Sequence, residues 1–203
     1  MKFLITLALF FMAVVIHEYA HGWVAWKLGD STAKRAGRLT LNPMAHIDPI
    51  GTIFLPMILL VTHSPVVFGW AKPVPVDFRS LNNPKKDMVW VGLAGPTANI
   101  IMAVLLSFVL KFFTLTGSPL FMAILSSAIL INLVLAVFNI LPIPPLDGSR
   151  VAMGLLPPDI AMQYAKLEPY GFIIIFGLLY LGIVGRVIWP LVMYLAQTLG
   201  AGL

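Results

Sequence analysis

The sequence predicts an all-α polytopic membrane protein with about five to six membrane segments and a short β-hairpin or re-entrant region after the first helix. Hydrophobic residues make up 60% of the 203-residue chain and charged residues 10%, whereas a soluble domain carries about 25% charge. Several apolar stretches are long enough to cross about 30 Å of hydrocarbon as helices. One further apolar stretch is too short for a comfortable span, which predicts the re-entrant region. We expect residues 1–203 to form a single domain.

The first apolar stretch, residues 3–28, carries the sequence HEYAH at positions 17–21. Two histidines four positions apart on a helix differ by about 40° around its axis, so both imidazoles can reach one metal ion. The glutamate beside the first histidine projects away from the ion, where it can take a proton from water. The pattern predicts His17 and His21 as zinc ligands and Glu18 as the catalytic base of a metalloprotease. The alternative, ordinary buried polar residues, is costly in an apolar helix.

A loop, residues 36–78, is expected next, and it contains the short apolar stretch of residues 50–62. If that stretch crossed the membrane, the basic clusters before and after it would face opposite sides. The positive-inside rule favours both clusters in the cytoplasm, so we expect the stretch to dip in and return. The basic residues are Lys27, Lys34, Arg35 and Arg38 before the stretch and Lys72, Arg79, Lys85 and Lys86 after it.

Residues 36–42 and 70–76 could each supply a strand edge to an extended substrate, with an ordinary surface hairpin as the alternative.

Two long apolar stretches follow, at residues 88–111 and 119–141, and each is long enough to span the bilayer. With the basic clusters in the cytoplasm, the first helix runs from outside to inside, the second span returns outward and the third runs inward again. The inner ends of the first and third spans therefore lie on the same side. This topology predicts that HEYAH and the chain after residue 141 come close together.

The segment of residues 142–156 opens with prolines and contains the motif LDG. Proline cannot continue a helix, so we expect the third span to unwind and to present Asp147 on irregular backbone that lines a wet cavity. Two histidines and one carboxylate are a usual catalytic zinc set with a fourth position left for water. Asp147 could also cap the helix that follows, and the two roles do not exclude each other.

The last apolar stretch, residues 170–203, is 34 residues long. As one straight helix it would extend about 51 Å, which exceeds the thickness of the hydrocarbon core. We therefore expect one or two spans here, with a turn near Arg186 that follows Gly182 and Gly185 and precedes Pro190.

The composition excludes several kinds of protein. The chain has no cysteine, so disulfides and thiolate ligands are excluded and any zinc must be held by nitrogen and oxygen. A net charge of +5 in so apolar a chain reports membrane topology rather than nucleic-acid binding. A membrane metal transporter or channel stays open as an alternative, because intramembrane histidines and acids also line ion paths. A transporter would be expected to show repeats or several ligands spread over its spans.

Three motifs together resemble the site-2 protease family of intramembrane zinc metalloproteases: HEYAH, GLAGPTANI at residues 92–100 and FNILPIPPLDG at residues 138–148. The resemblance covers most of the chain and implies a small member without PDZ or CBS domains. It implies one zinc ion per chain and hydrolysis of peptide bonds within or near transmembrane segments, as in regulated intramembrane proteolysis. The residues that the family pattern assigns to zinc and to water activation are His17, His21, Asp147 and Glu18.

Two asparagines are candidate substrate-binding residues. Asn139 lies eight positions before Asp147, as in the family pattern, and Asn99 belongs to the GPTAN motif. Amides inside spans can join helices or bind the backbone of an unwound substrate, and both roles stay open. The implied partners are transmembrane protein substrates, the lipid bilayer and an unseen regulatory or adaptor protein. The implied location is the cytoplasmic membrane, with the site toward the cytoplasm.

Overall fold

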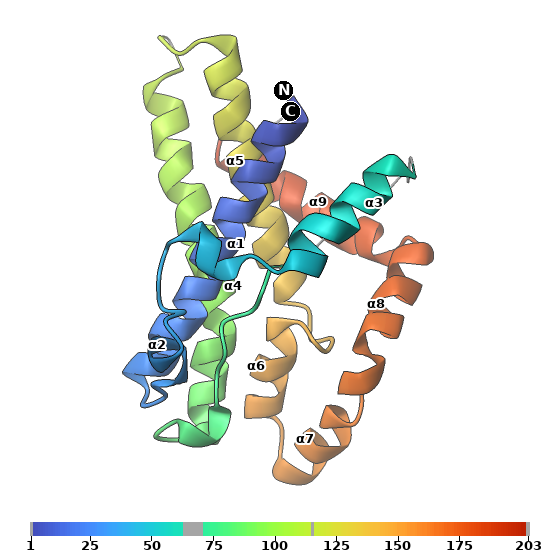
Figure 1. The fold of residues 1–203 in the computed structure, drawn as a ribbon. Helices are drawn as coiled ribbons and strands as arrows, with labels where there is room; N and C mark the ends of the chain where they lie inside the picture. The colour runs from blue at the N-terminus through green and yellow to red at the C-terminus, as the bar shows by residue number, and fades with distance from the viewer. Residues whose placement is uncertain (1, 63–70, 115, 202–203) are drawn as a thin grey trace.

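Three long helices form the centre of the computed structural model, which describes residues 2–62, 71–114 and 116–201. The helices α1, α4 and α5 contact one another and run in alternating directions (Figure 1). Short 3-10 helices cover Pro43–His46, Phe78–Ser80 and Glu168–Tyr170, and a π-helix covers Pro49–Phe54. The α-helices are α1 (Lys2–Lys27), α2 (Thr32–Arg35), α3 (Leu55–Val61), α4 (Pro84–Phe112), α5 (Pro119–Asn139), α6 (Asp147–Leu155), α7 (Pro158–Ala165), α8 (Gly171–Tyr180) and α9 (Ile183–Thr198).

The three central helices are long and apolar enough to cross a membrane. Large apolar side chains cover their outer faces: Ile101, Leu105 and Phe108 of α4 are all more than half exposed and are spaced along one helix face. Contact of such an apolar surface with lipid is favourable, whereas its exposure to water is unfavourable. The described residues contain three candidate spans, or four if a bent C-terminal pair of helices is one span. This count does not confirm the predicted five to six segments.

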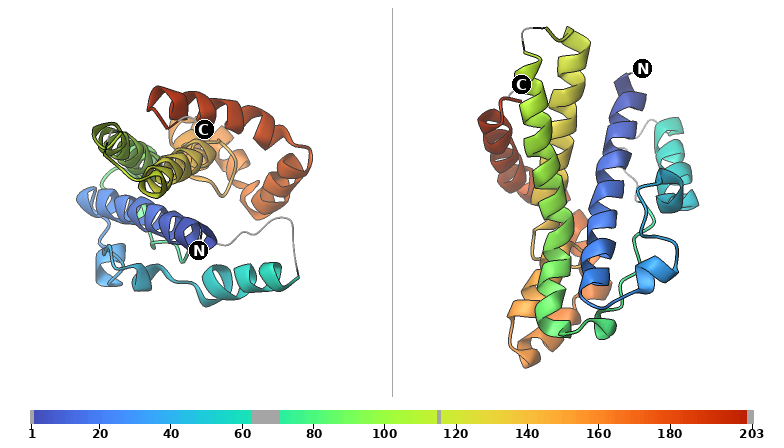
Figure 2. Two further views of the ribbon diagram at one scale, coloured as in Figure 1. Left: turned by 90° about the horizontal axis from the view of Figure 1, so that it is seen from above. Right: turned by 90° about the vertical axis from the view of Figure 1, so that its left-hand side faces the viewer.

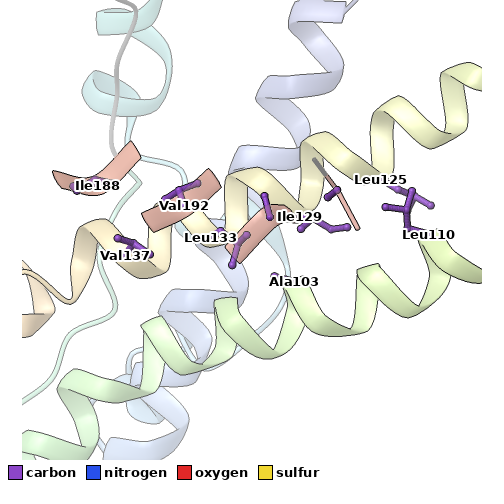
Figure 3. Packing of buried hydrophobic residues seen from close by; sticks show 10 residues of the cluster. Ala103, Leu110, Leu125, Ile129, Leu133, Val137, Ile188 and Val192 are labelled. Carbon is purple, nitrogen blue, oxygen red and sulfur yellow. The ribbon is translucent and has the colours of Figure 1, made fainter. Parts of the chain in front are cut away.

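The main apolar core is formed by side chains of α4, α5 and α9, with α5 packed against both other helices (Figure 3). Ile129 and Leu133 of α5 face Val192 of α9, and Ala103 of α4 closes the cluster; all four side chains are almost fully buried. Small and branched side chains at these positions allow the helices to approach closely. Helix α9 thus packs against α5, and the polar side chains of His17, Asn99 and Asn132 meet where α1, α4 and α5 contact one another.

The C-terminal stretch is divided by a turn, as its length predicts. The turn lies at Gly182, which has a φ of +68°, a conformation that glycine adopts without strain. The helical segments Pro158–Tyr180 and Gly185–Thr198 meet at an angle of 79°. The turn therefore comes earlier than the predicted Arg186, because Arg186 and Pro190 both lie inside α9.

The short apolar stretch after α1 forms the π-helix and α3, which together are too short to be a span. These helices lie on the side of α1 opposite α9 (Figure 2) and expose Phe54, Met57 and Ile58. Neither re-entry nor crossing follows from this placement, so re-entry stays a prediction. The predicted hairpin is not confirmed, because the described residues contain no strand: residues 36–42 and 71–76 have only turns, bends or no regular secondary structure. Trp70, at the start of the second predicted edge, lies outside the described residues.

A buried aspartate joins the end of α1 to the chain that precedes α4. Asp30 is fully buried. Its carboxylate accepts hydrogen bonds from the backbone N–H and hydroxyl of Thr32 and, at 2.8 Å, from the backbone N–H of Asp77. The segment of residues 71–77 is therefore fastened at one end beside the last turn of α1.

Replacing Asp30 with alanine is expected to lower the free energy of unfolding by about 1–3 kcal/mol, because the backbone N–H groups of Thr32 and Asp77 lose their buried acceptor. The midpoint of thermal unfolding in detergent measures the effect. Asp159→Ala, at an exposed position of α7, is the matched control. Equal midpoints for the two variants would show that the Asp30 hydrogen bonds do not stabilise the fold.

Candidate metal centre and active site

The paired histidines lie one turn apart on the buried face of α1. His17 is 6% exposed and His21 is 8% exposed. Their Nε2 atoms are 3.0 Å apart, so both imidazoles converge on one point, as the four-residue spacing predicts. Two lone pairs directed at one point inside an apolar bundle are suited to a shared cation.

Asp147, which is distant from the histidines in the sequence, brings a carboxylate to the same point. Its Oδ2 atom lies 2.9 Å from His17 Nε2 and 3.2 Å from His21 Nε2. Among the described residues, this trio is the one group of histidine, cysteine and acidic side chains with ligand atoms close enough to hold a metal. Three ligands leave a fourth tetrahedral position free, which is the arrangement of a catalytic metal site.

The segment that carries Asp147 is a chain of turns followed by a helix, rather than the predicted irregular strand. After α5 ends at Asn139, residues 140–146 form turns and bends, and Asp147 is the first residue of α6. Gly148 permits this tight return, because a Cβ there would overlap the carbonyl of Ile140. The residue before α6 is Leu146, so Asp147 does not occupy the N-cap position and its side chain is directed to the histidines.

Hydrogen bonds behind the histidines fix which ring nitrogen carries the proton. His17 Nδ1 lies 2.6 Å from Asn99 Oδ1, and His21 Nδ1 lies 2.7 Å from the carbonyl oxygen of Val91. Both partners are acceptors, so each Nδ1 donates and each Nε2 keeps its lone pair for the metal. Such partners of ligating histidines set the tautomer and the ring orientation and raise ligand basicity.

Glycine at position 95 provides the space that the two imidazoles occupy. A Cβ built on Gly95 would lie 2.5 Å from both Cε1 and Nε2 of His17 and would collide with His21 Nε2 as well. Real Cβ atoms do not approach other heavy atoms so closely. The α4 backbone therefore forms one wall of the site. Gly92, one turn earlier on the same helix, lies against the backbone of Asp147 in the same way.

The charge at the site fits a divalent cation bound by nitrogen and oxygen. The Asp147 side chain supplies one carboxylate, and its Oδ2 atom faces the Nε2 atoms of both histidines. A carboxylate is ordinarily ionised at neutral pH and supplies the negative charge that a divalent cation requires. Two neutral imidazoles, one carboxylate and no cysteine match the donor set of catalytic zinc, and the Gly95 cradle and the fixed tautomers show that these residues fit the ion.

Glu18 lies beside the trio, and its carboxylate is bound by the backbone of residues 71–77, which we call the strap. The N–H of Val74 donates to Glu18 Oε2 at 2.7 Å. The Lys72 N–H donates to the His46 carbonyl at 2.9 Å, and the Arg38 guanidinium donates to the Lys72 and Pro73 carbonyls. The strap is thus held across the catalytic end of α1 by side chains and loops instead of by a strand partner.

The two asparagine candidates differ in their hydrogen-bond partners. Asn99 is fully buried behind His17, a placement that favours positioning of the histidine over contact with a substrate. Asn139 is the last residue of α5, and its amide donates to the Leu135 carbonyl of the same helix at 3.0 Å, so substrate binding by Asn139 stays a prediction.

Sequence reasoning missed the roles of Gly95, the Val91 carbonyl and the Val74 N–H. A usable signal existed for one of them: Gly95 lies four residues before Asn99, so both are on one face of α4. Backbone groups carry no sequence signal, so the other two could not be assigned from side-chain identity.

Comparisons with known proteins point the same way as the geometry. The model of the peptidase family M50 matches residues 116–179. YwhC of Bacillus subtilis (strain 168), which bears the name of a candidate zinc metalloprotease, is 41% identical over 187 residues, covering 89% of this chain and 82% of YwhC. Rip2 of Mycolicibacterium smegmatis, similarly named, is 29% identical, covering 87% of this chain and 67% of Rip2. No solved structure matches the chain significantly.

The fold and the site together define a membrane-embedded metalloprotease: an HExxH helix meets a distant carboxylate among helices of membrane length. The similarity to YwhC extends over most of both chains. The chain belongs to peptidase family M50, the site-2 protease family, and is an intramembrane zinc metalloprotease. Family membership and the single compact site do not favour the alternative of a metal transporter.

Proposed function

We propose that His17, His21 and Asp147 hold one zinc ion per chain and that Glu18 is the catalytic base, for hydrolysis of peptide bonds within or near transmembrane segments of membrane proteins. The observation that supports the proposal most strongly is the convergence of three ligand atoms within 3.2 Å of one another. Both histidines are also fixed from behind in the tautomer that binds metal.

Zinc, when bound, acts as a Lewis acid that polarises the scissile carbonyl and lowers the pKa of water. Glu18 accepts the proton of the attacking water and later donates it to the leaving amine. The carboxylate is suited to this role because Glu18 follows His17 directly on α1 and is not one of the three converging side chains. Its Oε2 atom also accepts the Val74 N–H, so the strap orients the base in the free enzyme.

The substrate must lose helical structure before the reaction, because a peptide bond in an intact helix is shielded by side chains and committed to internal hydrogen bonds. The strap offers few donors to an incoming strand: the Lys72 and Val74 N–H groups are bonded within the protein, and Pro73 and Pro75 have none. We therefore propose that substrate selection depends on the membrane core, on carbonyl acceptors of the loops, or on a regulatory or adaptor protein.

We place the site toward the cytoplasmic face of the cytoplasmic membrane. The C-terminal end of α1 and the N-terminal end of α4 lie at the same end of the bundle (Figure 1). Basic residues cluster in these parts of the chain, and the positive-inside rule assigns such an end to the cytoplasm. The residues in question are Lys27, Lys34, Arg35, Lys85 and Lys86.

The proposal is tested by zinc analysis and by cleavage of a reconstituted transmembrane substrate. The purified protein is expected to contain one zinc per chain, to lose cleavage on treatment with a chelator, and to recover it when zinc is added back. Asp147→Ala is expected to bind zinc more than about 100-fold more weakly, exceeding the loss for an outer hydrogen-bond partner.

Asp159→Ala, at an exposed acidic position, is the control and is expected to keep both zinc and cleavage. Unchanged zinc stoichiometry in Asp147→Ala would remove Asp147 from the ligand set. Chelator-resistant cleavage would contradict a metalloprotease mechanism. Zinc flux into sealed vesicles without any cleavage would instead support a transporter.

A further inference from the structure

Two buried asparagines form a polar connection between α1, α4 and α5 within the membrane-spanning part of the bundle. Asn99 is 0% exposed and Asn132 is 5% exposed, and both helices that carry them are candidate spans. A buried amide is costly unless all its donors and acceptors are satisfied. Polar residues inside spans are also more often functional than incidental.

The hydrogen bonds of the pair run in one direction, from α5 toward the metal site. Asn132 Nδ2 donates to the Ala128 carbonyl at 2.9 Å, so Asn132 Oδ1 is the group that faces Asn99. Asn99 Nδ2 donates to that oxygen at 2.8 Å and to the Ala13 carbonyl at 3.2 Å. Both N–H groups of Asn99 are then used, and its oxygen is left for His17 at 2.6 Å.

The opposite orientation of the Asn99 amide is excluded by two acceptors. If the amide were flipped, Asn99 Oδ1 would face both the Ala13 carbonyl and Asn132 Oδ1, and acceptors would oppose acceptors. The flipped amide would also present a donor to His17 Nδ1. The His17 proton would then move to Nε2, the atom that must bind metal. The orientation of one amide therefore decides whether His17 can act as a ligand.

We propose that Asn132 is a positioning residue of the zinc site: it fixes the Asn99 amide, which in turn fixes the tautomer and the ring orientation of His17. The inference rests on the proposed ligand set. Asn132 touches neither the metal nor the substrate. His21 is independent of this connection, because its Nδ1 donates to the backbone carbonyl of Val91. Loss of Asn132 should accordingly weaken one ligand and leave the other in place.

The competing role for Asn132 is helix packing alone, since the Asn99–Asn132 bond also joins α4 to α5. A packing role predicts that loss of Asn132 lowers the stability measured by unfolding, whereas a positioning role predicts that it raises the zinc Kd. The matched control is Ser107→Ala, because Ser107 is a buried polar residue of α4, 2% exposed, whose hydroxyl donates to Val104 in its own helix. Removal of that hydroxyl perturbs the same bundle without touching the Asn99 connection.

The experiment measures the zinc Kd of the full chain in detergent by competition with a chelator, and the visible spectrum of the cobalt-loaded protein. Asn132→Leu is expected to raise the zinc Kd about 10-fold, the lower end of the range for partners of metal ligands, and to shift the cobalt bands. Ser107→Ala is expected to change neither. Asn132→Asp keeps an acceptor for Asn99 and is expected to restore the Kd to within about 3-fold of wild type.

An unchanged Kd and an unchanged cobalt spectrum in a folded Asn132→Leu protein would overturn the proposal and leave packing as the role. If Asn132→Leu does not fold, Asn132→Ser is measured instead, with the same expectations, because it removes the amide oxygen with less bulk. Failure of the wild-type chain to bind zinc would refute the proposed ligand set itself, an outcome distinct from equal binding by wild type and variant.

Discussion

Glu18→Gln is expected to lower the rate of substrate cleavage by about 10³-fold or more, while zinc binding stays at the wild-type level. General-base catalysis contributes roughly 10²–10⁴-fold to enzymatic rates, and Glu18 is the carboxylate beside the ligand trio. The amide of glutamine has nearly the same shape and can still accept the Val74 N–H, so the strap should keep its place. Single-turnover cleavage of a reconstituted transmembrane substrate, together with zinc analysis of the same sample, measures both properties.

The control for this variant is Glu168→Gln, at an exposed glutamate that is not part of the trio and pairs with Arg150. That change is expected to leave cleavage unaltered. Wild-type cleavage by a zinc-replete Glu18→Gln protein would remove Glu18 from the mechanism. Loss of zinc from Glu18→Gln would show instead that Glu18 contributes to metal binding.

Gly95→Ala is expected to weaken zinc binding by about 10³-fold and to abolish cleavage, although it adds only one methyl group. The methyl would lie 2.5 Å from atoms of His17 and would also overlap His21, so both ligands must move. Mutation of an outer hydrogen-bond partner of a metal ligand lowers the metal affinity about 10–100-fold. We expect a larger loss here, because both histidine ligands themselves are displaced. The zinc Kd of the purified variant is the measurement, with circular dichroism to show that the helices remain.

Gly177→Ala is the matched control for added bulk on a helix, because a Cβ at that position of α8 meets nothing within 4 Å. It is expected to bind zinc as wild type does. Tight zinc binding by Gly95→Ala would show that α4 can shift away from α1 at little cost, and the cradle would then have no role in holding the ion.

The long spans could be predicted from the sequence because hydropathy over 20 or more residues decides them. The first residue of α4 was harder to predict from the sequence. Lys85, Lys86 and Asp87 interrupt the apolar run, yet the helix begins at Pro84, behind an Asn83 cap whose side chain accepts the Lys86 N–H. The predicted strand edge is not confirmed, for another reason: residues 71–77 are held by Glu18, Arg38 and Asp30, and alternation cannot distinguish such contacts from strand pairing.

The convergence of His17, His21 and Asp147 could be predicted from the sequence, whereas the residues that surround them could not. The spacing of the two histidines is local, and the topology predicted from the basic residues placed the chain after residue 141 at the same end of the bundle. The contributions of Gly95 and Asn132 depend on how α4 and α5 are rotated against α1. That rotation is set by packing around side chains such as Ile129, and a single sequence does not encode it in any short motif.

The strap brings a distant part of the sequence into direct contact with the residue that we propose as the catalytic base. Because the Val74 N–H donates to Glu18 Oε2 at 2.7 Å, one oxygen of that carboxylate is hydrogen-bonded in the free enzyme. A displacement of residues 71–77 would release that oxygen, so the position of the strap and the hydrogen bonding of the base would change together.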